Sequence, residues 1–448
     1  MHLRSKLSLT LVIFVLFFSA LRAENEFPVD KAITYGKLDN SFTYYIRENE
    51  KPKDKAYIKL VIKAGSVMEE ENQLGLAHLL EHMAFNGSTN YPKNALDKFM
   101  SSIGLDIGSH YNAYTSYLET VYEYEIPTDD PENIATTIKI LADISNNLTL
   151  EGEAFEREKK IVEEEWRSDL GASKRYLDEL LPYLYKSSRL LERKPIGDME
   201  VIRNFEYDDA RSYYKKWYQP NLMGLFVIGD VDVNKIKNII TESFSSFENN
   251  DVTIPNYKIP DFNENQFFKY QDEETERITF SLWEKTDFKK LNNFDNYKDD
   301  RIYNLISDIY QRRIDELLEK NELAFLNSGL GNSQVSDLDE YKTVSVTLNE
   351  AKINEGIIDF LTFIKQIEKF GFLNSELDLA KKNYLQYLKQ NIIDEETRSS
   401  ESYVNEYQRH FLNDEMISSS EDQLKFTKEI LPSITILDLN NYFKKYIQ

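Results

Sequence analysis

The sequence predicts an α+β fold of two homologous units, each an antiparallel-rich sheet packed by helices. Three observations lead to this fold class. Strand-like and helix-like patterns alternate along the chain, an Asn- and Pro-rich segment divides it near the middle, and one short motif occurs in both halves. A chain of 448 residues exceeds a single hydrophobic core, and its 41% hydrophobic and 13% aromatic residues can fill more than one.

Two segments have the pattern of strands and two have the pattern of helices. At 56–66 and 117–126, apolar and polar residues alternate, as on a strand with one wet face. At 72–85 and 134–145, apolar residues follow helical spacing. Antiparallel strands with helices on one face give the α+β class.

The Asn- and Pro-rich segment at 249–265 is predicted to be a linker between a first unit at 24–248 and a second unit at 266–448. The motif YYKKWYQ at 213–219 resembles YFKKYIQ at 442–448. After the first copy come a turn and an apolar strand pattern, whereas the second copy is the last segment of the sequence. We therefore expect the second unit to lack its last strand, which leaves one sheet edge unpaired.

Residues 1–23 have the layout of a secretory signal peptide. Arg4 and Lys6 precede an apolar run at 7–21, and Ala23 offers a small residue at a cleavage point. The run is short for a membrane span, so we expect an exported protein without stable membrane insertion after cleavage. The alternative is an uncleaved segment that tethers the protein to a membrane. Cysteine is absent, which excludes disulfides and thiol chemistry.

The charge balance argues against two classes of partner. There are 54 Lys and Arg against 77 Asp and Glu, so the formal charge is 54 − 77 = −23. Nucleic acids and anionic membranes are bound by concentrated positive charge, so neither is an expected partner.

The stretch HLLEHMAFNGS at 78–88 carries the candidate chemistry. On a helix, His78 and His82 share a face and can both reach one metal ion, and Glu81 places a carboxylate beside a metal-bound water. The alternative is two partly buried helix residues without a ligand. Because the whole chain has only 5 histidines, two at ligand spacing around a glutamate favour the metal site.

The stretch FEREKKIVEEEWR at 155–167 can complete such a site. Glu158 and Glu165 are two helical turns apart and lie on one stripe, so one can bind the metal and the other can support a ligand. The alternative is a solvated charge run, and spacing alone does not choose among the glutamates.

Together these stretches resemble the pitrilysin/insulinase family of zinc peptidases. HLLEHMAFNGS, NAYTSYLETVYEYEIP at 112–127 and EREKKIVEEEWR at 156–167 occur in the family's order. The likeness covers most of 33–248. The chain resembles the N-terminal half of the large bacterial exported members or the zinc-bearing subunit of the mitochondrial processing peptidase. Residues 266–448 fit loosely as the second, non-catalytic unit. The resemblance implies a periplasmic zinc endopeptidase acting on peptides or unfolded segments.

The resemblance also assigns roles to residues. It implies one Zn²⁺ per chain, held by His78, His82 and Glu165, with Glu81 as the general base that activates water. Glu158 then supports a histidine ligand from behind.

Two further residues, Asn112 and Ala113, match the family's edge strand. In the family this strand receives the substrate as an added strand through backbone hydrogen bonds.

One stretch departs from the family pattern. In members built from two such units, the partner unit supplies an Arg and a Tyr to the substrate and the developing oxyanion. The matching positions in 316–325 hold Leu318 and Phe325, which donate no hydrogen bond. We therefore expect a second homologous half or a partner subunit to supply this pair. The alternatives are a non-catalytic zinc-bearing or scaffold subunit and a module that binds peptides without cutting them.

Overall fold

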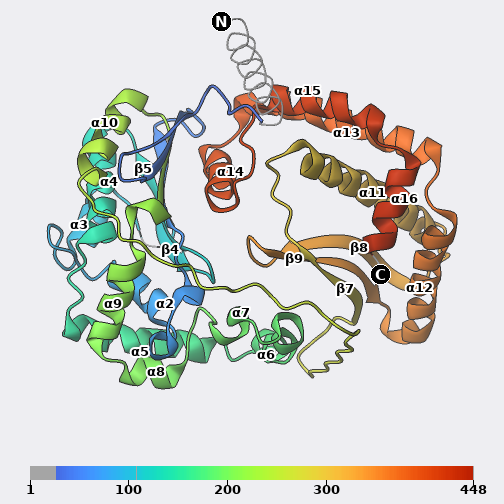
Figure 1. The fold of residues 1–448 in the computed structure, drawn as a ribbon, viewed down its shortest axis with the longest axis horizontal. Helices are drawn as coiled ribbons and strands as arrows, with labels where there is room; N and C mark the ends of the chain where they lie inside the picture. Colours follow the sequence, from blue (N-terminus) through green and yellow to red (C-terminus); the bar gives the residue numbers. More distant parts are fainter. Residues whose placement is uncertain (1–26, 107, 447–448) are drawn as a thin grey trace, which may run out of the picture. The chain divides into compact units, whose positions relative to one another are not determined.

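The computed structural model describes residues 27–106 and 108–446, which form two compact units (Figure 1). The N-terminal unit comprises residues 31–276 together with 397–412. The C-terminal unit comprises 27–30, 277–396 and 413–446 of the described residues. The predicted signal peptide at 1–23 lies outside the described residues.

The N-terminal unit is built on a six-stranded sheet with strand order β1-β2-β6-β3-β5-β4. All neighbours are antiparallel except β2 and β6, which are parallel. Strand β4 is at the end of this order and pairs only with β5 among the described strands. The strands are β1 Thr34–Lys37, β2 Thr43–Glu48, β3 Lys55–Ile62, β4 Tyr111–Thr115, β5 Thr120–Pro127 and β6 Met223–Gly229.

The two predicted strands are β3 and β5, which pair with each other along their whole length. Tyr122 and Tyr124 of β5 are fully buried, while Glu123 and Glu125, which alternate with them, are partly exposed. The alternation in sequence therefore corresponds to one face of the sheet that packs on helices and one that is more open.

Helices α2 and α4 pack on one face of this sheet, and α5 packs on α2 from outside. The predicted helix at 134–145 is α4, which begins after Asp130, whose side chain accepts the backbone N–H of Glu132. The helices of the N-terminal unit before the linker are α2 Leu76–Met83, α3 Ala95–Ser102, α4 Pro131–Asn146, α5 Gly152–Ser168, α6 Ala172–Tyr185, α7 Arg189–Glu192, α8 Met199–Asn204, α9 Tyr207–Trp217 and α10 Val233–Phe244.

The predicted helix at 72–85 is shorter than expected. Residues 71–73 form a 3₁₀ turn, and α2 begins at Leu76 after Gly75, which has φ +95°. A side chain is strained at that φ, so the glycine fixes where the helix starts.

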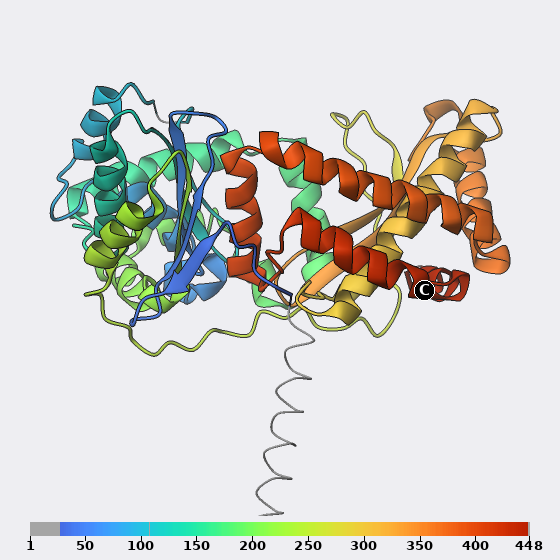
Figure 2. The same cartoon turned by 90° about the horizontal axis from the view of Figure 1, so that it is seen from above.

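The opposite face of the sheet is covered by α14 (Ser400–Asn413), which comes from the far end of the chain. Lys59 of β3 donates to Gln408 of α14 at 3.1 Å, and Gln408 donates in turn to the hydroxyl of Tyr114 on β4 at 2.8 Å. Figure 2 shows this helix beside the strands of the N-terminal unit. No pattern in the sequence indicated that residues 397–412 would join the first unit.

The C-terminal unit contains a three-stranded antiparallel sheet with order β7-β9-β8. This order repeats β3-β5-β4 of the N-terminal unit, and no described strand takes the place that β6 has beside β3. The two-unit α+β fold is thus confirmed, with fewer strands in the second sheet. Its elements are β7 Thr279–Asp287, α11 Phe294–Glu319, β8 Phe325–Gln334, β9 Asp339–Leu348, α12 Ile353–Phe370, α13 Asn374–Asp394, α15 Ser420–Ile430 and α16 Ile436–Tyr446.

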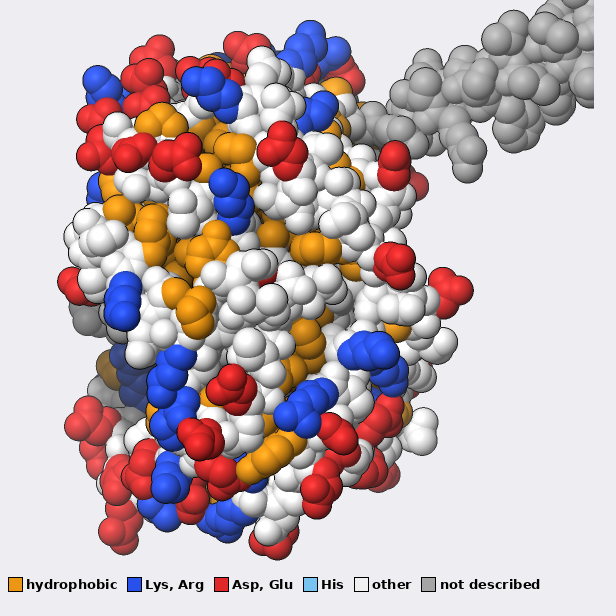
Figure 3. Space-filling model, turned by 90° about the vertical axis from the view of Figure 1, so that its left-hand side faces the viewer, with side chains coloured by type: hydrophobic (Ala, Val, Ile, Leu, Met, Phe, Trp, Pro, Cys, Tyr) orange, Lys and Arg blue, Asp and Glu red, His pale blue; other side chains and the backbone are white. Residues whose placement is uncertain are grey.

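The linker at 249–265 has no helix or strand, and the irregular segment continues to the start of β7. The shared motif closes α9 in the first unit, and the described part of its second copy closes α16. Within 27–106 and 108–446, no helix has both the length and the apolar character needed to cross a membrane. Figure 3 shows acidic and basic side chains interspersed over one face.

Candidate metal centre

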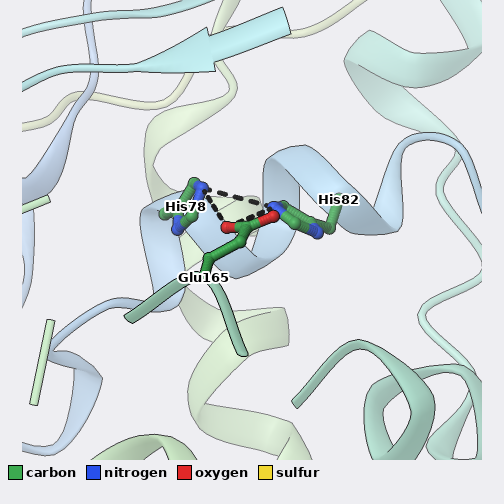
Figure 4. A group of neighbouring side chains, drawn as sticks. All are labelled: His78, His82 and Glu165. Carbon is green, nitrogen blue, oxygen red and sulfur yellow. Dashed lines mark hydrogen bonds and ion pairs between the residues drawn. The ribbon is translucent and has the colours of Figure 1, made fainter. Parts of the chain in front are cut away.

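Helix α2 turns two histidines toward helix α5. The Nε2 atoms of His78 and His82 are 3.2 Å apart, and the Oε2 atom of Glu165 from α5 is 3.6 Å from each of them. Figure 4 shows the three side chains converging from the two helices. The structure thus brings together the three residues that the resemblance assigned as ligands.

The spacing of these three atoms suits a tetrahedral zinc ion. Zinc binds imidazole nitrogen and carboxylate oxygen at about 2.0–2.2 Å, so two ligand atoms of a tetrahedral site lie about 3.3–3.6 Å apart. The observed separations are 3.2, 3.6 and 3.6 Å. The side chain of Glu165 is 42% exposed, so the cluster is open to solvent on its side. The residues present therefore fit zinc with room for a further ligand.

The pKa values of the two histidines are shifted in opposite directions. Burial, and then the neighbouring His82, lower the pKa of His78 to about 4, so its ring is neutral. Burial also acts to lower the pKa of His82, but the hydrogen bond with Glu158 and the negative charge of Glu165 outweigh it and hold that pKa above its usual value. A metal ion therefore competes with a proton for His82.

Behind His82 lies a chain of polar side chains. Nδ1 of His82 is 3.3 Å from Oε2 of Glu158, whose other oxygen accepts the side-chain N–H of Asn86 at 2.9 Å. Arg157 donates to Asn86 at 3.2 Å. Burial acts to raise the pKa of Glu158, but the bonds from His82 and Asn86 hold it below its usual value, so the carboxylate is charged. A charged acceptor at Nδ1 keeps the proton there and leaves Nε2 free as a ligand.

Glu81 lies on the same helix and is 6% exposed. Oγ1 of Thr115, the last residue of β4, donates to its Oε2 at 2.8 Å. Burial raises the pKa of Glu81 to about 7, although the bond from Thr115 acts in the opposite direction. A carboxyl with a pKa near 7 can accept and return a proton near neutral pH.

Glu69, which is fully buried, caps the first turn of α2. Its carboxylate accepts the backbone N–H groups of Gly75 at 3.0 Å and Ala77 at 2.8 Å. Arg193 donates to the backbone carbonyl of Glu69 at 3.0 Å. These bonds satisfy amide groups that a helix start leaves unpaired, and they fix the orientation of the helix that carries the histidines.

The two residues assigned to substrate binding, Asn112 and Ala113, both lie on β4. The outer edge of this strand pairs with no described strand. In the register of the sheet, Ala113 is opposite Tyr122, which is buried on the α2 side, and Asn112 is opposite Glu123 on the other side.

Sequence reasoning missed three residues of this site: Asn86, Thr115 and Glu69. Asn86 and Thr115 lie within the stretches HLLEHMAFNGS and NAYTS, one turn after His82 and three residues after Asn112. Their partners are far away in sequence, so spacing carried no signal for either contact. Glu69 precedes the motif by nine residues and has no feature that distinguishes it from the glutamates beside it.

Two family models match consecutive parts of the chain, and the second match crosses from the N-terminal unit into the C-terminal unit. The model of the insulinase peptidases, Peptidase family M16, matches residues 44–188, and the model of the M16 inactive domain matches residues 204–384. The chain belongs to the M16 peptidase family. Every residue of the metal cluster of this M16 chain lies within the first match.

Relatives of the M16 chain include proteins named as zinc proteases. The probable zinc protease PqqL of Escherichia coli is 29% identical over 416 residues, which are 92% of this chain and 44% of that protein. The crystal structure of the periplasmic protease PqqL from Escherichia coli matches with a TM-score of 0.90 and 27% identity, covering 94% of this chain and 46% of that one. The structure of the first half of PqqL matches with the same TM-score and identity, and 90% of it is covered.

The M16 chain spans about half the length of the curated relatives it matches, between 40% and 47% for three of them.

Proposed function

We propose that the M16 chain is the zinc-bearing half of an endopeptidase that hydrolyses peptides or unfolded polypeptide segments. The proposal rests on one observation. Three candidate ligand atoms lie at the spacing of a zinc site, and Glu81 is buried on the helix that carries the two histidines. When bound by His78, His82 and Glu165, zinc supplies the Lewis acidity that makes water a nucleophile near neutral pH.

The chain's own residues then bind substrate and move the proton. Glu81 takes the proton of the attacking water and passes it to the leaving amine, a task that suits its pKa of about 7. An extended substrate adds to the open edge of β4 beside Asn112 and Ala113. Binding of this kind depends on backbone hydrogen bonds and suits a peptidase of broad specificity.

A second half or a partner subunit completes the site in this proposal. Leu318 packs against the hydrophobic core of the C-terminal unit, and Phe325 is 3% exposed within that core. Neither side chain donates a hydrogen bond, so the oxyanion needs donors from elsewhere. A partner that supplies an Arg and a Tyr would meet this need.

The proposed location is the periplasm. The proposal rests on the N-terminal pattern of the sequence and on the relative PqqL, which is described as periplasmic. On expression in Escherichia coli, we expect the protein in the periplasmic fraction with an N-terminus near residue 24. Retention of the full N-terminus in the membrane fraction would instead support a tether.

The activity is tested with a quenched fluorescent peptide and the purified chain. We expect only weak hydrolysis by the chain alone, which a chelator abolishes and zinc restores, with one zinc per chain. Glu81→Gln should keep the zinc and lose hydrolysis by about 10²-fold or more, because it removes the base and no ligand. Normal turnover by this variant would contradict the role of Glu81, and efficient cleavage by the monomeric chain would contradict the need for a partner.

A further inference from the structure

One side chain of the edge strand β4, that of Thr115, contacts the candidate base Glu81. Ala113 and Thr115 lie on the face of β4 toward α2, whereas Asn112 and Tyr114 lie on the face toward α14. From this position Thr115 donates its hydroxyl proton to Oε2 of Glu81 at 2.8 Å. Among the described residues, this is the one side-chain hydrogen bond by which the strand reaches the carboxylate of Glu81.

We propose that Thr115 is a positioning residue for the general base, which fixes the carboxylate of Glu81 relative to the strand that receives the substrate. The inference rests on the proposed function, because it assigns the device that aligns that function's base. Thr115 is not one of the candidate metal ligands, so this role is separate from metal binding.

The geometry gives the two oxygens of Glu81 different tasks. Oε2 accepts the hydroxyl of Thr115, whereas the structure gives Oε1 no hydrogen-bond partner among the described residues. A glutamate side chain has several rotatable bonds, so without an anchor its carboxylate samples several directions. With Oε2 anchored, Oε1 is the oxygen that faces a water and takes its proton.

The strand that carries Thr115 is itself held in place from its other face. Tyr114 accepts a hydrogen bond from Gln408 of α14 at 2.8 Å, and Gln408 also accepts one from Lys59 at 3.1 Å. The same strand, β4, would therefore position both an added substrate and the carboxylate of Glu81. Such alignment acts on the chemical step more than on substrate binding, because the backbone edge that binds peptide is unchanged by loss of the hydroxyl.

A matched pair of substitutions separates the hydroxyl from the shape of the side chain. Thr115→Val keeps the branched shape and removes the donor, whereas Thr115→Ser keeps the donor. Thr241→Val is the control, because Thr241 is an exposed threonine of α10 that donates to the carbonyl of Lys237. Zinc affinity should stay within about twofold for all three variants, because none of them touches a ligand residue.

Two readouts test the proposal on the zinc-loaded protein. In crystal structures, we expect the Glu81 carboxylate in one orientation in the wild type and in Thr115→Ser, and in several orientations in Thr115→Val. In peptide hydrolysis, we expect kcat of Thr115→Val to fall by about 10- to 100-fold with KM within about twofold, and Thr115→Ser and Thr241→Val to stay within about threefold.

The results distinguish this inference from the proposed function. If the wild type cleaves no peptide with or without a partner half, the proposed function fails, and the crystal structures still decide whether Thr115 positions Glu81. The inference is overturned if Glu81 keeps one orientation in Thr115→Val. It is also overturned if an active wild type is matched in kcat by Thr115→Val, or if Thr115→Ser loses as much as Thr115→Val.

Discussion

Replacement of Glu158 by Gln tests how the site holds a histidine ligand from behind. The carboxylate of Glu158 accepts from two donors, Nδ1 of His82 at 3.3 Å and the amide of Asn86 at 2.9 Å. A glutamine offers one accepting oxygen and one donating nitrogen. Whichever way its amide turns, one of the two donors loses its acceptor, and the negative charge beside His82 is lost as well.

The magnitude follows from the burial and charge of this group. Glu158 is 8% exposed, and its low pKa keeps it ionised, so its bond to His82 is charge-assisted. Hydrogen bonds to charged groups contribute about 1.5–3 kcal/mol. At about 1.4 kcal/mol per tenfold change, this corresponds to a loss in zinc affinity of about 10- to 100-fold, the range known for partners of metal-bound histidines.

The assay is zinc affinity measured by competition with a chromophoric chelator, which does not depend on catalysis. The matched control is Glu164→Gln on the same helix, because Glu164 is 69% exposed and, among the described residues, pairs only with Arg167. A second substitution, Asn86→Asp, should restore part of the affinity of Glu158→Gln, because the new carboxylate can accept the glutamine's amide and leave its oxygen for Nδ1 of His82. If Glu158→Gln binds zinc as tightly as Glu164→Gln, the support of His82 by Glu158 is refuted.

Three more predictions concern stability and pH. Glu69→Ala leaves the buried amides of Gly75 and Ala77 without acceptors, so the free energy of unfolding measured in urea should fall by about 2–4 kcal/mol. An unchanged urea midpoint would contradict the role of Glu69 as a cap. In the metal-free protein the pKa of His82 is raised, so its contribution to stability is complete below about pH 6.5 and is lost as the pH rises through the raised pKa. Zinc affinity should rise over the same interval, and thermal unfolding with and without zinc between about pH 5.5 and 8.5 should show these opposite slopes. Gln408→Ala removes one buried and one partly buried hydrogen bond to the sheet and should lower the free energy of unfolding in urea by about 1–3 kcal/mol. An unchanged free energy of unfolding would mean that α14 is held by its other contacts.

The parts of the fold that the sequence predicted are those with local patterns. Strands β3 and β5 follow from alternation over about eight residues, and α4 follows from helical spacing, because both periodicities are properties of neighbouring residues. The pair His78 and His82 was visible for the same reason. The start of α2 at Leu76 was missed, because it depends on the backbone of Gly75 and on a cap from Glu69.

Contacts between distant segments could not be predicted in this way. Helix α14 joins a sheet whose strands lie more than 150 residues earlier in the chain, and nothing in its own sequence specifies that partner. The choice of Glu165 over neighbouring glutamates came only from the resemblance to a family. In the structure that choice depends on the packing of α5 against α2, which a spacing of seven residues does not specify.

The two units share a strand order but differ in the side chains that could bind a metal or transfer a proton. The order β3-β5-β4 recurs as β7-β9-β8, and in both units helical structure fills the connection between the first and second of these strands in the chain. In the N-terminal unit that connection contains α2 with its two histidines and Glu81. In the C-terminal unit it is α11, which has no histidine and turns Ile302, Leu305 and Ile309 into the core instead. A sheet of this order therefore supports either a metal-binding helix or an apolar one, and function follows from a few side chains rather than from the fold. Leu318, near the end of α11, packs against the same core.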